Sequence, residues 1–284
     1  MDNIDLIISP RWLIPVVPAR TCLDRHSLVV HQNRIVDILP TEAAVNRYTA
    51  ARHDRLEDHA LIPGLINTHT HAAMSLLRGL ADDKSLKDWL NNYIWPREMK
   101  WVSPQFISDG VELAIAEMLL GGTTCFNDMY FFPDVMAQAA DRHGMRAVTG
   151  LIVLDFPTPW AANPDEYLEK GMALFDELRH VELVTATLAP HAPYTVSDQP
   201  LEKIRMLSDE LDLPIHMHVH ETQTEIDHSL DKYGKRPIER MRELDLLGPN
   251  LLAVHLTHVT DEELDLLAEH GVSAVHCPQS NMKL

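Results

Sequence analysis

The sequence lacks the cysteine patterns of disulfide scaffolds and of thiolate metal sites. Its three cysteines, Cys22, Cys125 and Cys277, lie far apart, and no CxxC pair occurs. A dispersed, odd set of thiols forms no disulfide framework and is typical of a protein from a reducing compartment. We therefore predict a cytoplasmic location.

Long apolar runs and basic clusters are also missing. No segment reaches the roughly 18 apolar residues of a membrane helix, and the acidic start MDNIDLIISPRW is not typical of a signal peptide. Acidic residues outnumber basic ones by 42 to 24, giving a net charge of −18. Arg236, Arg240 and Arg242 alternate with acids and predict a solvated helix face. We expect no nucleic-acid partner and no membrane partner.

Two segments of different rhythm follow one another along the chain. Residues 1–60 are rich in short β-type runs, with a hairpin turn predicted at HQNR, and we interpret them as the N-terminal part of a small β-sandwich domain. From residue 61, seven apolar runs alternate with helical stretches. The helices are expected at 107–120, 133–143, 165–179, 199–211, 235–245 and 261–269.

This alternation predicts an α/β fold, a (β/α)8 TIM-type barrel over residues 61–284. The nucleotide-binding fingerprints GxGxxG and the P-loop are absent, which disfavours a doubly wound sheet. Such barrels usually span about 250 residues. Only seven strands fit before Leu284, so we expect strand 8 and the return of the chain to the sandwich to lie beyond it, in a longer protein.

Histidine is abundant, with 17 residues, and its placement is informative. In LINTHTH, His69 and His71 lie two residues apart at a strand end, so both side chains point the same way, about 6.6 Å apart along the strand. Two neutral imidazoles suit a transition metal such as zinc. The alternative is a pair of polar strand-end residues that hydrogen bond to loops.

The fifth predicted barrel strand, PIHMHVHET, carries a second group. His216, His218 and His220 share one face, and burying all three without partners is costly. Strand spacing alone does not show which of them binds metal. Glu221 follows at the strand end, where a carboxylate beside an activated water serves acid–base chemistry. Three further histidines end other strands and converge on the same barrel mouth: His191, His255 and His276.

The ordered motifs resemble the amidohydrolase superfamily, and in particular its 5-methylthioadenosine/S-adenosylhomocysteine deaminases. The resemblance covers essentially the whole chain. It is carried by PGLINTHTH, SLLRGLADDKSLKDWL, IWPRE, GGTTCFNDMY, APHAPYTVS, HVHET and HCPQSNMKL.

The resemblance implies a role for each matching residue. His69, His71 and His218 would bind one zinc ion, with Fe²⁺ or Mn²⁺ as alternatives, and an aspartate beyond Leu284 would be the fourth ligand. Glu221 and His255 would be catalytic, with Glu221 carrying a proton to the purine ring nitrogen and His255 stabilising charge on the attacking oxygen. The residues expected to bind substrate are Glu98, His191 and Glu221. His276 is expected to pack or hydrogen bond.

The implied reaction is hydrolytic deamination of 5′-methylthioadenosine, S-adenosylhomocysteine or adenosine to the inosine form plus ammonia, in an enzyme that could be a homo-oligomer. Some relatives have arginines after strand three that hold a homocysteine carboxylate. This chain has no arginine between Ala147 and Leu178, and Trp160 offers an apolar surface instead. One alternative is an amidohydrolase for guanine, a modified nucleoside or an s-triazine. Another is a truncated, inactive barrel that acts as a subunit, since a chain ending at Leu284 would bind metal weakly.

Overall fold

The computed structural model describes residues 2–284, in two compact units. The first unit ends at Gly64, and the second spans Leu65–Leu284. Among the described residues no helix combines the length and apolar character that a membrane span requires.

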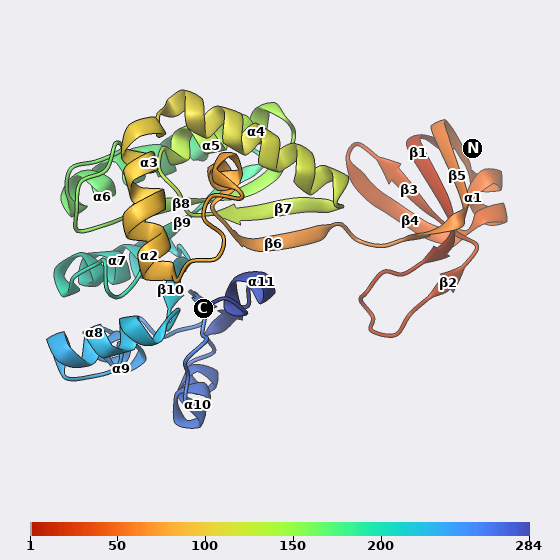
Figure 1. The fold of residues 1–284 in the computed structure, drawn as a ribbon. Helices are drawn as coiled ribbons and strands as arrows, with labels where there is room; N and C mark the ends of the chain where they lie inside the picture. Colours follow the sequence, from red (N-terminus) through yellow and green to blue (C-terminus); the bar gives the residue numbers. More distant parts are fainter. Residues whose placement is uncertain (1) are drawn as a thin grey trace. The chain divides into compact units, whose positions relative to one another are not determined.

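The first unit is a five-stranded sheet with one helix (Figure 1). Its elements are β1 (Asp2–Leu13), β2 (Leu23–Asp24), β3 (His26–His31), β4 (Arg34–Pro40), α1 (Thr41–Arg47) and β5 (Tyr48–Leu61). β1 pairs antiparallel with β2 and β3 and parallel with β5. The hairpin turn predicted at HQNR is confirmed, because Gln32 and Asn33 between β3 and β4 have φ of 50° and 60°, as a two-residue hairpin turn requires.

The length of β5 differs from the short strands that the sequence predicted. β5 runs for 14 residues, and it pairs with β1 from Tyr48 to Leu61. Its many charged residues have a low strand propensity, so the sequence does not predict its full length. Pairing along the whole of β1 stabilises it. The small core of this unit consists of Ile4, Ile7, Val29, Ala44 and Tyr48. Its membership of a β-sandwich stays a prediction.

The second unit contains seven parallel strands in chain order, which confirms the predicted β/α-barrel class (Figure 1). The strands are β6 (Leu65–Thr70), β7 (Thr123–Asp128), β8 (Arg146–Val153), β9 (Val184–Pro190), β10 (Ile215–Val219), β11 (Leu251–His255) and β12 (Ser273–Val275). Every neighbouring pair is parallel. Parallel order places all carboxyl ends, and the histidines at them, at one mouth.

Helices follow the strands. They are η1 (Ala72–Leu77), α2 (Leu86–Trp89), η2 (Leu90–Ile94), α3 (Trp95–Trp101), α4 (Pro104–Leu120), α5 (Pro133–Arg142), α6 (Pro164–Leu178), α7 (Asp198–Leu211), α8 (Gln223–Tyr233), α9 (Pro237–Glu243), α10 (Asp261–Glu269) and α11 (Pro278–Asn281). Side chains of Ser103, Asn163, Thr222 and Thr260 cap α4, α6, α8 and α10, which explains where these helices begin.

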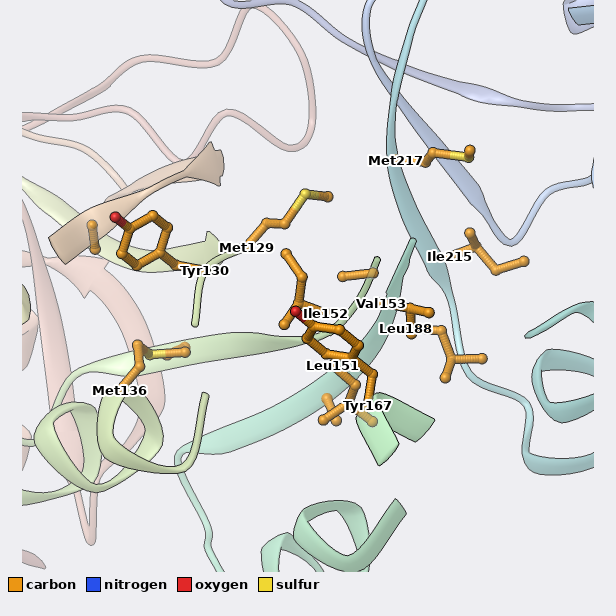
Figure 2. Packing of buried hydrophobic residues seen from close by; sticks show 14 of the residues in the cluster. Met129, Tyr130, Met136, Leu151, Ile152, Val153, Tyr167, Leu188, Ile215 and Met217 are labelled. Atoms are coloured by element: carbon orange, nitrogen blue, oxygen red, sulfur yellow. The ribbon is translucent and has the colours of Figure 1, made fainter. Parts of the chain in front are cut away.

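The barrel core is built from strands that are buried on both faces. Figure 2 shows Leu151, Ile152 and Val153 of β8 near Leu188 of β9, with Ile215 and Met217 of β10 beyond them. Helix α4 also approaches η1 closely, because a Cβ added at Gly110 would lie 2.4 Å from the carbonyl oxygen of Ala73. Glycine is therefore required at position 110. Ala73, which it contacts, lies in η1 two residues after His71 in the chain.

Arg240 corrects one prediction, because its side chain is not on a solvated face. Only 3% of Arg240 is exposed. Its guanidinium donates to the carbonyl oxygens of Pro193 and Val196 and to the carboxylate of Asp198. Charge alternation in the sequence could not reveal these partners, which lie on the loop after β9 and at the start of α7.

Candidate functional site

The carboxyl ends of the barrel strands surround a cavity of about 970 Å³. All the predicted site residues line it: His69, His71, Glu98, His191, His218, Glu221, His255 and His276. The structure therefore brings together side chains that are up to 207 positions apart in the sequence. All of them come from strand ends except Glu98, which lies on α3. Trp160 does not line it; its ring packs on Phe132 and Lys170.

Four imidazoles form the centre of the site. His69 Nε2 and His218 Nε2 are 3.1 Å apart, and the ring of His71 lies 4.8 Å from that of His69 and 5.2 Å from that of His218. His255 stacks on His218 with ring centroids 5.4 Å apart. Nitrogens of His69, His218 and His255 lie within 4.8 Å of one another. This spacing suits a shared cation.

The opposite nitrogen of each predicted ligand is already hydrogen bonded. His71 Nδ1 lies 2.6 Å from the carbonyl oxygen of Met129, and His218 Nδ1 lies 2.8 Å from that of His191. His69 Nδ1 lies 2.9 Å from His216 Nε2. Metal-binding histidines typically use one ring nitrogen in this way and present the other to the metal. The donor set therefore fits a divalent cation that favours nitrogen, such as zinc.

Burial keeps these imidazoles neutral. Desolvation lowers the pKa of His69, His71 and His218 below the ordinary value, and neighbouring histidines lower the pKa of His69 and His218 further. A neutral imidazole has the lone pair that a metal ligand needs. The closest trio of nitrogens includes His255 in place of His71, so the choice between these two as third imidazole ligand stays a prediction.

Glu221 stands at the end of β10 and its backbone is clamped from both sides. The Glu225 carboxylate accepts the backbone N–H groups of His220 and Glu221, at 3.0 and 2.8 Å. The Thr257 hydroxyl lies 2.8 and 2.5 Å from the carbonyl oxygens of the same two residues. His220 is held at a φ of 52°, a conformation that non-glycine residues rarely adopt. This clamp directs the Glu221 side chain into the cavity.

Glu221 and His255 face each other across the cavity. Glu221 Oε1 is 3.6 Å from His255 Nε2. Burial raises the pKa of Glu221 to about 7, which suits a group that accepts and returns a proton at neutral pH. Asn281 holds His255 from behind, since its Oδ1 lies 3.0 Å from His255 Nδ1 and its Nδ2 donates to the His255 carbonyl. His276 is exposed and contacts the same Asn281.

Glu98 and His191 lie at the side of the cavity. Glu98 is buried on α3, where its carboxylate accepts a hydrogen bond of 2.5 Å from Tyr130. Burial raises its pKa, and the Tyr130 contact opposes this. His191 bonds Thr195 through Nδ1 at 2.9 Å, and burial lowers its pKa to about 3, so it is a neutral hydrogen-bonding group.

Three supporting residues escaped the sequence analysis. Glu225 and Thr257 form the clamp, and the buried Asp128 accepts the Thr70 hydroxyl and the Ala72 N–H on either side of His71. Burial raises the pKa of Asp128 to about 6. The sequence does carry a signal for two of them. Asp128 ends the strand TTCFND, and Glu225 lies in the first turn of the helix that follows HET. Acids at such positions commonly accept hydrogen bonds from backbone N–H groups.

The chain resembles known proteins along almost its whole length. Residues 60–284 match the amidohydrolase family. The chain is 48% identical over 280 residues to a 5-methylthioadenosine/S-adenosylhomocysteine deaminase of Saccharophagus degradans, a match that covers 99% of this chain and 63% of the relative. A deaminase of the same name from Teredinibacter turnerae is 47% identical, over 99% of this chain and 64% of the relative.

Solved structures show the same likeness. A crystal structure of an adenosine deaminase from Xanthomonas campestris with bound zinc has a TM-score of 0.97 and 48% identity, covering all of this chain and 64% of that one. Atrazine chlorohydrolase from Arthrobacter aurescens, at 19% identity and a TM-score of 0.90, shares the fold. The chain spans less than two thirds of the length of its first curated relatives. By the match over residues 60–284, the chain belongs to the amidohydrolase family.

Proposed function

We propose that this chain carries the metal site and the acid–base group of a hydrolytic deaminase of adenosine derivatives, such as 5′-methylthioadenosine, S-adenosylhomocysteine or adenosine. The observation that carries the proposal is the meeting of the histidine cluster with Glu221, whose pKa lies at about 7. The relatives named as deaminases support it.

His69, His71 and His218 would hold the cation, with an aspartate beyond Leu284 as the expected fourth ligand. The chemistry that zinc supplies when bound is activation of water at neutral pH. Iron and manganese have overlapping ligand preferences, so zinc is proposed on the ring-nitrogen donors and on the zinc in the Xanthomonas neighbour.

The chain's own residues would do the rest. Glu221 Oε1 would deliver a proton to the purine ring nitrogen and then one to the departing amine, both taken from the attacking water, because a carboxyl of pKa about 7 exchanges protons readily near neutrality. His255 Nε2, on the other side of the same space, would stabilise charge on the attacking oxygen. Glu98 would accept a ribose hydroxyl, and His191 would donate to or accept from the substrate.

Ammonia release tests the proposal. The protein, in its full natural length and loaded with zinc, is expected to deaminate the three adenosine derivatives, and Glu221→Gln is expected to lose at least ~100-fold in kcat while keeping its zinc. Guanine and an s-triazine serve as competing substrates. Faster turnover of either one would replace the nucleoside assignment, and full activity in Glu221→Gln would remove the proposed acid–base role.

Two broader predictions accompany the activity. The cytoplasmic location is supported by three thiols without a disulfide partner, and the homo-oligomeric state rests on the resemblance to the deaminases. Fractionation of cells and light scattering of the purified protein test them.

A further inference from the structure

A buried histidine next to the proposed ligands has no role in the proposed reaction. His216 on β10 is completely buried, and its Nε2 lies 2.9 Å from His69 Nδ1. The two rings meet edge to face, with centroids 4.9 Å apart. Among residues 2–284, no side chain or backbone group hydrogen bonds to the other nitrogen, His216 Nδ1. Buried polar atoms are nearly always paired, so this one calls for an explanation.

The positions of several hydrogens in the cluster are fixed by carbonyl groups, which only accept. His218 Nδ1 faces the His191 carbonyl oxygen, and His71 Nδ1 faces that of Met129. Both Nδ1 atoms therefore carry the hydrogen, and both Nε2 atoms carry a lone pair. Both ring nitrogens of His69 face other histidines, so its hydrogen can lie on either one.

His69 has two arrangements. Its Nε2 lies 3.1 Å from His218 Nε2, which carries a lone pair. Two nitrogens at this distance share either a hydrogen or a cation. When they share a cation, His69 Nε2 must also present a lone pair, so its hydrogen moves to Nδ1. That hydrogen then needs an acceptor, and His216 Nε2 is the atom in contact.

We propose that His216 is a positioning residue for the metal site: it accepts the Nδ1–H of His69 and so fixes the ring and the tautomer in which His69 Nε2 binds the cation. This inference rests on the proposed metal site. It adds a residue that ring spacing and strand position do not distinguish from His220, which bonds instead to the His258 carbonyl and the Ile238 N–H.

The unpaired atom follows from this role. In the arrangement that binds the cation, the hydrogen of His216 is on Nδ1, where no protein group of the described chain accepts it. In the arrangement that shares a hydrogen, His216 Nε2–H donates to His69 and every imidazole N–H of the relay is paired. In both arrangements His216 makes one hydrogen bond to His69 and leaves Nδ1 unpaired within the part of the chain that the structure describes. Its contribution to cation binding is therefore the orientation of His69, and replacing it with an apolar side chain should change the stability of the metal-free protein little.

Competition with a chromogenic chelator tests this in the full-length protein. His216→Leu removes the acceptor and should weaken Zn²⁺ binding ~10–100-fold, the range seen for residues that orient a ligand, with the melting temperature in chelator unchanged or raised. His216→Gln keeps an amide oxygen as acceptor and should restore much of the affinity. Thr187→Val, on the neighbouring strand β9, is the matched control. It removes a buried hydroxyl that donates to the Pro214 carbonyl, and it should lower the melting temperature without changing zinc affinity.

Unchanged zinc affinity in His216→Leu would overturn the proposal, as would a loss of stability in chelator as large as that of Thr187→Val. The tautomer can be read in the unsubstituted protein by long-range ¹H–¹⁵N spectra of labelled histidine. With zinc bound, His69 and His216 should both carry the hydrogen on Nδ1, and a hydrogen on His216 Nε2 contradicts the inference. If the unsubstituted protein binds no zinc, the metal site and this inference fail together; if it binds zinc and His216→Leu binds it equally well, this inference alone fails.

Discussion

The buried carboxyl of Glu225 makes a quantitative prediction about stability and pH. Glu225 is 3% exposed, and burial raises its pKa from 4.5 to about 8, against the opposing effect of the two N–H groups that it accepts. Its pKa is raised in the folded protein, so between pH 4.5 and 8 the folded state binds more protons than the unfolded state, and this contribution to stability is lost as the pH rises. Each pH unit between 4.5 and 8 changes the free energy of unfolding by ~1.4 kcal/mol, so the loss of stability between pH 6 and pH 9 is roughly 3 kcal/mol.

Glu225→Gln removes this titration and leaves the other ionisable groups in place. Urea unfolding of both proteins in chelator at pH 6, 7, 8 and 9 gives the difference between their free energies of unfolding at each pH. Effects of the substitution that do not depend on pH cancel when these differences are compared. The advantage of the unsubstituted protein over Glu225→Gln should shrink by 2–3 kcal/mol, as a rough estimate, across this range. Glu262→Gln is the control, because hydrogen bonds lower the pKa of this exposed carboxyl. A difference that is flat, or that grows with pH, would refute the assignment of a protonated Glu225.

Four further predictions concern the site and its supports. Thr257→Val, which loses the hydroxyl beside the His220 and Glu221 carbonyls, should lower kcat by up to ~100-fold with zinc content unchanged, and Thr257→Ser should keep most of the activity in the same assay. Gly110→Ala places a Cβ against the Ala73 carbonyl and should cost ~1–3 kcal/mol in urea unfolding, whereas Gly121→Ala, with its nearest contact at 3.4 Å, should change the free energy by less than ~0.5 kcal/mol. Arg240→Met leaves two carbonyl groups without their donor and should destabilise the fold by at least ~2 kcal/mol, measured the same way. Removing zinc with a chelator should lower the melting temperature, by the equivalent of ~2.7 kcal/mol when free zinc had been at 100 times its dissociation constant; an unchanged melting curve would contradict the metal site.

Strand periodicity predicted the barrel and the convergence of its histidines, because both follow from short-range pattern. His69 and His71 share a face by their two-residue spacing, and the parallel strand order brings His191, His218 and His255 to them. The helix at 261–269 was predicted at its observed bounds, where Thr260 and Glu263 form a capping box.

Features with a weak local pattern, or with partners far away in the sequence, were not predictable. The helix Gln223–Tyr233 is mostly polar, with only Ile226 as a buried large apolar residue, so its apolar periodicity is weak. The expected helix at 235–245 is shorter, Pro237–Glu243. Arg240 is buried through carbonyl groups 44 and 47 residues away in sequence, and no local pattern encodes them.

The anchors of the proposed ligands also bear on how the site tolerates mutation. His71 and His218 are oriented by main-chain carbonyl groups, at Met129 and His191, and a substitution at either anchor position leaves its carbonyl in place. His69 is oriented by a side chain, that of His216. A single base change at codon 216 can therefore remove an anchor, whereas codons 129 and 191 are free to drift as far as ligand orientation is concerned. Among variants of this protein, substitutions that misorient a metal ligand through its anchor should therefore occur at position 216, because only that anchor is a side chain.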